Sequence, residues 1–174
     1  MSQSIEIRPL NISEIDIVRK LSDEIWKKVY PSIISMDQIE YMLELIYNEE
    51  ALKKQVNELG HQFILVIDND IPIGYASYSL KVGKAEGEYR LHKFYLQPEH
   101  HGKGLGKQMM NHIIHDVQNN GGNSIELNVN KYNPTLHFYK KLGFSVISEE
   151  IIEIGNDYVM DDYVMSLNPL KYPL

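Results

Sequence analysis

The spacing of apolar residues near the start of the chain predicts a short strand followed by three helices. After the strand, apolar positions recur every three or four residues, as expected for helices with one buried face. The helical segments span 13–30, 36–47 and 49–59. Ser13 is the expected N-cap of the first helix, and Gly60 is expected to end the third.

Seven segments carry continuous or alternating apolar residues and are predicted to be strands. They span 5–8, 63–67, 71–80, 88–96, 125–129, 145–154 and 158–167. A polar loop is expected at 83–87, and turn residues at 155–157 make the last two strands a hairpin. Two further helices are predicted, one starting near Leu105 and one of about ten residues between Asn133 and Gly143. Strands and helices interleave without regular alternation, and this order predicts a mixed α/β fold.

A glycine-rich loop joins a predicted strand to a predicted helix in the segment 96–107, LQPEHHGKGLGK. Glycine tolerates positive φ, and the free N–H groups at a helix start attract anions, so this loop is predicted to hold a phosphate. A dinucleotide-binding loop, G-x-G-x-x-G, needs a glycine where Lys107 stands. A P-loop needs serine or threonine where Gln108 stands. Neither nucleotide-binding pattern therefore fits.

Two segments resemble motifs of the GNAT N-acetyltransferase family. The loop His101-Gly102-Lys103-Gly104-Leu105-Gly106 resembles the acyl-CoA motif [QR]-x-x-G-x-[GA], with histidine in the first position. The segment from Asn133 to Phe144 resembles N-x-x-A-x-x-F-Y-x-x-x-G-F, with its first half one residue short. The resemblance extends in weaker form over residues 5–167. The segment FYKKLGF and the form of the last hairpin also resemble the bacterial spermidine/spermine N-acetyltransferases.

The resemblance implies the GNAT acyl-CoA N-acyltransferase fold. This fold has a central, mostly antiparallel sheet of about seven strands, splayed between strands 4 and 5 and flanked by about four helices. The pantetheine arm of the cofactor enters the gap between the splayed strands. At 174 residues, the whole chain is expected to form a single domain with a core at about 5–167.

The implied reaction transfers the acetyl group of acetyl-CoA to a primary amine, such as a small cationic polyamine. Direct attack in a ternary complex is expected, because the chain has no cysteine to serve as a thiol nucleophile. No metal is expected. Two alternatives remain open: acetylation of a protein N-terminus or lysine, and a non-catalytic acyl-CoA-binding sensor or interaction module.

The same resemblance implies roles for individual residues. Tyr139 occupies the position often assigned as general acid to the CoA sulfur, with core packing of the ring as the alternative. Glu88 and His92 are the candidate bases. The alternative is a relay of water molecules in which no single residue is the base. The expected cofactor-binding residues are Tyr95, Leu96, His101, Gly102, Lys103, Gly104, Leu105, Gly106, Lys107, Asn133, Tyr139 and Lys141. For Asn133 helix capping is the alternative role, and for Lys141 it is simple solvation.

Composition narrows the choice of partners. The net charge is −7 and the basic residues form no tract, so nucleic-acid binding is not expected. An acidic surface favours a cationic acceptor, although it also aids solubility. No apolar run approaches the ~20 residues of a membrane span, and the first ten residues do not read as a signal peptide. We therefore expect a cytoplasmic protein without membrane contact. Its terminal strands could pair with those of a second copy to form a homodimer.

Overall fold

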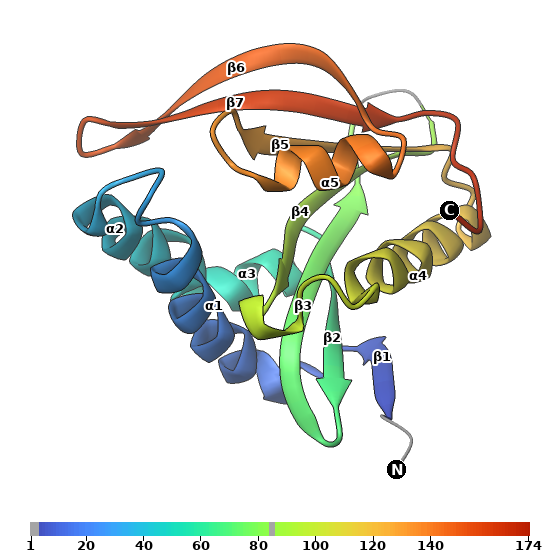
Figure 1. Cartoon of the computed structure of the whole chain (residues 1–174), viewed down its shortest axis with the longest axis horizontal. Helices are drawn as coiled ribbons and strands as arrows, with labels where there is room; N and C mark the ends of the chain where they lie inside the picture. The colour runs from blue at the N-terminus through green and yellow to red at the C-terminus, as the bar shows by residue number, and fades with distance from the viewer. Residues whose placement is uncertain (1–3, 84–85) are drawn as a thin grey trace. The chain divides into compact units, whose positions relative to one another are not determined.

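The computed structural model describes residues 4–83 and 86–174, and the chain divides into two compact units. The first unit comprises Met1–Ser79 and Lys93–Met109, and the second comprises Leu80–His92 and Met110–Leu174. Seven strands follow the order β1-β2-β3-β4-β5-β7-β6 (Figure 1). Part of the predicted loop at 83–87, and the first three residues of the chain, lie outside the described residues.

The first unit begins with a strand and three helices and continues into antiparallel strands. These elements are β1 (Ile5–Pro9), α1 (Ile15–Val29), α2 (Met36–Tyr47), α3 (Glu49–Asn57), β2 (Gln62–Asp68), β3 (Ile71–Leu80) and the second half of β4 (Glu88–Leu96). β2 pairs antiparallel with both β1 and β3. Its apolar run is buried from Phe63 to Ile67, as a central strand requires. A hydrogen bond of 2.7 Å between Ser22 Oγ and Tyr75 OH joins α1 to β3.

The start of the first helix differs from its prediction. A short 3₁₀ helix, η1 (Ile12–Glu14), precedes α1, and its cap is Asn11 rather than Ser13. The Asn11 side chain accepts a hydrogen bond from the Ser13 N–H, and the Glu14 carboxylate accepts one from the Asn11 N–H. This reciprocal capping box satisfies two backbone donors, so it outcompetes a single serine two residues further on.

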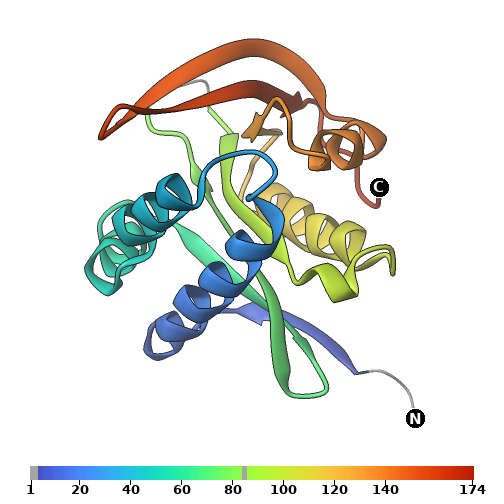
Figure 2. The ribbon, with the colours of Figure 1, turned by 60° about the vertical axis from the view of Figure 1, so that its left-hand side comes forward.

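The second unit is a sheet with one apolar and one polar face. It contains the first half of β4, the end of α4 (Leu105–Asn119), β5 (Ser124–Asn130), α5 (Thr135–Lys141), β6 (Ser145–Gly155) and β7 (Tyr158–Leu167). β4 runs parallel to β5, while β7 pairs antiparallel with β5 and β6. Figure 2 shows the β6–β7 hairpin as a long curved ribbon. The apolar residues of β5 are buried, as are those of the second half of β7, among them Ile125, Leu127 and Met165.

The parallel ladder between β4 and β5 is short. It joins Glu88–Leu91 to Ser124–Leu127, which is only the first part of β4. This agrees with the splayed fourth and fifth strands that the family resemblance implies. The third helix is present as α3. α5 has seven residues rather than about ten, because it begins at Thr135, after Pro134 at the N-cap, and ends at Lys141, before Gly143 turns the chain at a φ of 101°.

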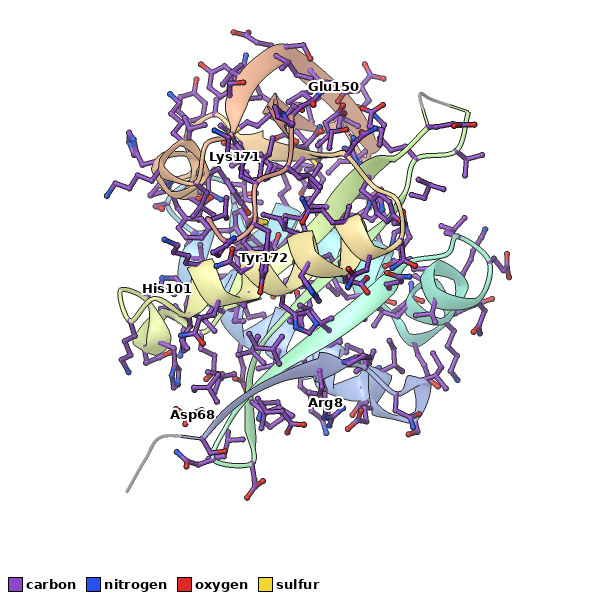
Figure 3. All side chains as sticks on the ribbon, turned by 90° about the vertical axis from the view of Figure 1, so that its right-hand side faces the viewer. Arg8, Asp68, His101, Glu150, Lys171 and Tyr172 are labelled. Atoms are coloured by element: carbon purple, nitrogen blue, oxygen red, sulfur yellow. The ribbon has the colours of Figure 1, made fainter. Side chains whose placement is uncertain are left out.

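The C-terminal segment after β7 folds back onto α4. The Leu174 N–H donates to Asn111 Oδ1 at 2.8 Å, and the rings of Tyr172 and His115 are 5.1 Å apart. Figure 3 labels Lys171 and Tyr172 in this segment. In residues 4–83 and 86–174, none of the helices combines the length and apolar character that a membrane crossing needs.

Candidate functional site

The glycine loop before α4 has the backbone conformation that its sequence predicts. Gly102 and Gly104 have φ values of 74° and 78°, in the left-handed region that favours glycine. No atom lies within 4 Å of where a Cβ would be built at either position, so the loop is open to an approaching ligand. The Gly104 carbonyl accepts the first helical hydrogen bond, from Gln108 N–H at 3.1 Å. The N–H groups of the residues between these two, Leu105, Gly106 and Lys107, come before the first helical hydrogen bond, so they can hold an anion.

His101 anchors this loop to the end of β4. Its Nε2 donates to the Leu96 carbonyl at 2.8 Å, which fixes the ring tautomer with hydrogen on Nε2. Figure 3 shows His101 beside the start of α4. The histidine thus ties the loop to the strand in the position where the family motif has glutamine or arginine. Nothing in the local sequence pattern indicated this contact.

An aromatic cluster fixes the end of β4. The Tyr95 ring lies 5.9 Å from Trp26 and 5.5 Å from Tyr75, and its hydroxyl is 3.0 Å from Tyr30 OH. On β3, a Cβ at Gly74 would stand 2.7 Å from the Tyr95 carbonyl, so only glycine permits this close approach of the two backbones. The main chain of Tyr95 and Leu96 is therefore held rigidly.

Lys93 is a buried lysine that sequence reasoning missed. Only 6% of it is exposed, and its Nζ donates to Gln55 Oε1 at 2.6 Å. The ammonium group lies 5.4 Å from the Tyr47 ring centre and 5.5 Å from that of Phe63. Burial lowers the pKa of Lys93 to about 8. Strand alternation puts Lys93 and His92 on opposite faces of β4. Alternation alone does not say which of the two faces is covered by other elements.

Asn133 and Tyr139 belong to the second unit. Asn133 Oδ1 accepts a hydrogen bond from the Thr135 N–H at 3.0 Å, but Pro134 rather than Asn133 is the N-cap of α5, so Asn133 supports the helix start from one residue before the cap. Tyr139 is 7% exposed, and its ring packs edge-on against Phe138 and Phe144 at 5.5 and 5.7 Å. This packing positions the tyrosine ring firmly within α5.

Glu88 lies in an ion-pair network on the polar face of the second unit. Lys81 Nζ is 2.8 Å from Glu88 and 2.9 Å from Glu126. Arg90 extends the network, 3.5 Å from Glu126. Burial lowers the pKa of Lys81, but the two carboxylates raise it by more, so the net shift is upward. A cavity of about 640 Å³ opens beside this network, with Glu86, Glu88 and Glu126 in its lining.

The predicted site residues thus fall into two groups. One group, in the first unit, comprises Tyr95, Leu96, His101, Gly102, Lys103, Gly104, Leu105, Gly106 and Lys107. The other, in the second unit, comprises Glu88, His92, Asn133, Tyr139 and Lys141. Lys141 is exposed and His92 is half-buried. The roles of these residues remain predictions.

A mixed sheet with a short parallel β4–β5 ladder, followed by an open glycine loop at a helix start, defines an acyl-CoA N-acyltransferase. The chain belongs to the GNAT acetyltransferase family, because residues 32–161 match the model of the Acetyltransferase (GNAT) domain. It is therefore an N-acetyltransferase enzyme that uses acetyl-CoA.

Relatives extend over nearly the whole chain. A curated spermidine N(1)-acetyltransferase of Thermoplasma acidophilum is 28% identical over 163 residues, covering 91% of this chain and 96% of the relative. The crystal structure of the PaiA N-acetyltransferase of Thermoplasma acidophilum with coenzyme A matches at a TM-score of 0.78 and 25% identity, covering 95% and 99% of the two chains. The structure of yncA, a putative acetyltransferase of Salmonella typhimurium with acetyl-CoA, shares the fold at a TM-score of 0.62 and 19% identity, covering 94% and 93%.

Proposed function

We propose that this enzyme acetylates a small cationic amine, a polyamine in the first instance. The observation that carries the proposal is the match to a spermidine N(1)-acetyltransferase over 91% of the chain. The net charge of −7 supports it, because an acidic protein attracts a polycation. We further propose direct attack of the amine on the thioester in a ternary complex, consistent with a chain that has no cysteine nucleophile.

The amine must lose a proton before it can attack. With a lysine-like pKa of about 10.4, forming the neutral amine at pH 7 costs roughly 4.6 kcal/mol. Glu88 and His92 are the candidate bases. The ion pair of Glu88 with Lys81 makes Glu88 the weaker candidate, because a paired carboxylate holds a proton less readily. The pH–rate profiles of Glu88→Gln and His92→Asn would separate the two, since only loss of the base removes the acidic limb.

Tyr139 is proposed to donate a hydrogen bond to the departing thiolate. Full proton transfer from a tyrosine of pKa about 10 to a thiolate whose acid has a pKa of about 8.5 is uphill by roughly 2 kcal/mol. A hydrogen bond that strengthens as negative charge develops avoids that cost. The packing of Tyr139 between Phe138 and Phe144 would hold the donor in place.

The cofactor contacts are proposed along β4 and α4. The N–H groups from Gly102 to Lys107 would bind the pyrophosphate, and the open loop at Gly102 and Gly104 fits an approaching phosphate. The main chain of Tyr95 and Leu96 would pair with the pantetheine arm like an added strand. Because the Leu96 carbonyl already accepts from His101, only its second lone pair is open to the arm. Asn133 and Lys141 are the proposed contacts from the second unit.

An amine panel tests the proposal. The purified protein is supplied with acetyl-CoA and, separately, with polyamines, amino acids or peptides, while free thiol is monitored. We expect the fastest thiol release with a polyamine. Release with peptides or amino acids and none with polyamines would overturn the proposed substrate class.

A further inference from the structure

Two carboxylates face each other on the polar side of the β6–β7 hairpin. Glu150 of β6 is directly opposite Asp162 of β7 in the antiparallel register. Like charges placed directly opposite in a sheet destabilise it. Such a pair calls for a compensating cation.

Two neighbouring acidic residues of the hairpin, Glu149 and Asp161, have a cation, whereas among the described residues no ion pair joins a lysine or arginine to Glu150 or Asp162. Lys131 Nζ is 2.8 Å from Glu149 and 2.8 Å from Asp161. Glu150 and Asp162 instead share the neutral amide of Asn128, whose Nδ2 is 2.9 Å from Glu150 Oε2 and 3.5 Å from Asp162 Oδ2. Glu149 and Asp161 are therefore paired with a cation, while Glu150 and Asp162 share only a neutral amide.

Asp162 also has an unsatisfied oxygen. The residue is 1% exposed, and within residues 4–83 and 86–174 its buried Oδ1 has no hydrogen-bond partner. Burial raises the pKa of Asp162 to about 6, with Glu150 and Asp161 acting in the same direction and Asn128 and Arg90 against it. At neutral pH the group is thus mostly ionised, with an oxygen that lacks a donor, which is costly unless a ligand supplies one.

Arg90 does not fill this role. Its guanidinium donates to Asn128 Oδ1 at 2.7 Å and lies 3.5 Å from Glu126 Oε1. This contact turns the amide oxygen of Asn128 away and presents its N–H₂ group to the two carboxylates. The Asn128 amide therefore holds the two carboxylates in place and is not itself a ligand for a cation, so the cation ligands must be the carboxylate oxygens.

We propose that Asp162 and Glu150, which Asn128 holds in place, form a binding site for an ammonium group of the acceptor amine. The inference rests on the proposed function, since a polyamine brings more than one ammonium group. An ammonium group has three donors and can bridge Asp162 Oδ1 and the Glu150 carboxylate. Glu150 is exposed on β6, where Figure 3 labels it, so the entrance is from its side.

Binding of spermidine without acetyl-CoA tests the site directly. Isothermal titration at pH 7.5 compares the wild type with Asp162→Asn and Glu150→Gln, which keep side-chain shape and remove one charge. Glu153→Gln is the matched control, because it removes a charge from an exposed residue of the same strand. We expect at least about tenfold weaker binding for the first two variants, since each loses a charge-assisted hydrogen bond, and no change for the control. Melting temperatures check that each variant is folded.

The outcomes separate this inference from the proposed function. Unchanged spermidine affinity in folded Asp162→Asn overturns the ammonium site, even if the wild type acetylates spermidine. Tight binding that depends on Asp162, in an enzyme that acetylates no polyamine, supports the site and overturns the proposed function. Equal weakening by Glu153→Gln would mean general charge attraction and would also overturn the site. Binding of Mg²⁺ or Ca²⁺ but not spermidine would do the same.

Discussion

At the scale of single residues, burial changes the ordinary chemistry of Lys93. Its charged form is disfavoured because the ammonium group is buried away from water, and the contacts with Gln55 and two aromatic rings replace that solvation only in part. The pKa of about 8 in the folded chain lies below the ordinary value of 10.5. Between pH 8 and pH 10.5 Lys93 is protonated in the unfolded chain and mostly neutral in the folded chain. The free energy of unfolding therefore rises with pH over this range.

Lys93→Met should remove this pH dependence. We expect the variant to be more stable than the wild type at pH 7 by about 1–3 kcal/mol, because no buried charge remains. The advantage should shrink by pH 9.5, where the wild-type lysine is mostly neutral. Urea unfolding of both proteins at the two pH values measures this difference, and a constant difference would contradict the burial argument.

Tyr139→Phe should reduce turnover without loosening the fold. The phenyl ring keeps its contacts with Phe138 and Phe144, while the hydroxyl donor is lost. We expect kcat to fall by about 10²-fold and the KM for acetyl-CoA to change little. Tyr132→Phe is the control, because Tyr132 is 74% exposed. A kcat equal to that of the wild type would remove Tyr139 from the mechanism.

At the scale of elements, the glycine loop and the start of α4 offer a matched pair of substitutions. Gly104 has a φ of 78°, whereas Gly106 lies inside α4. Gly104→Ala should destabilise the fold by about 1 kcal/mol and raise the KM for acetyl-CoA, because an L side chain strains the left-handed backbone. Gly106→Ala adds no backbone strain of this kind and should keep the stability. Thermal melts and acetyl-CoA kinetics decide, and equal effects at both sites would contradict the account.

The elements themselves were largely predictable, because apolar periodicity reports which side of a strand or helix is buried. The seven strands and the helices followed from it, and the first helix start failed only because a stronger capping box lies upstream of Ser13. Contacts between distant segments were not predictable. The hydrogen bond from His101 to Leu96, the burial of Lys93 and the pairing of Lys131 with Glu149 rather than with Glu150 depend on tertiary packing.

At the scale of the whole molecule, β4 and α4 each run through both compact units. Neither unit can unfold completely without breaking hydrogen bonds in these shared elements. We therefore expect one cooperative unfolding transition, as the predicted single domain requires. Circular dichroism follows the unfolding of both units. Tryptophan fluorescence follows the first unit, because Trp26 is the sole tryptophan and lies there, so the two signals should give the same midpoint. Two separate midpoints would contradict the prediction.

The central claim is that this GNAT enzyme acetylates a polyamine. The most direct test is the ratio of kcat/KM for spermidine to kcat/KM for a monoamine of similar length, measured by thiol release from acetyl-CoA. The account predicts a ratio of at least about ten, because a second ammonium group adds a charge-assisted contact. A ratio near one, or turnover with the monoamine alone, would contradict it.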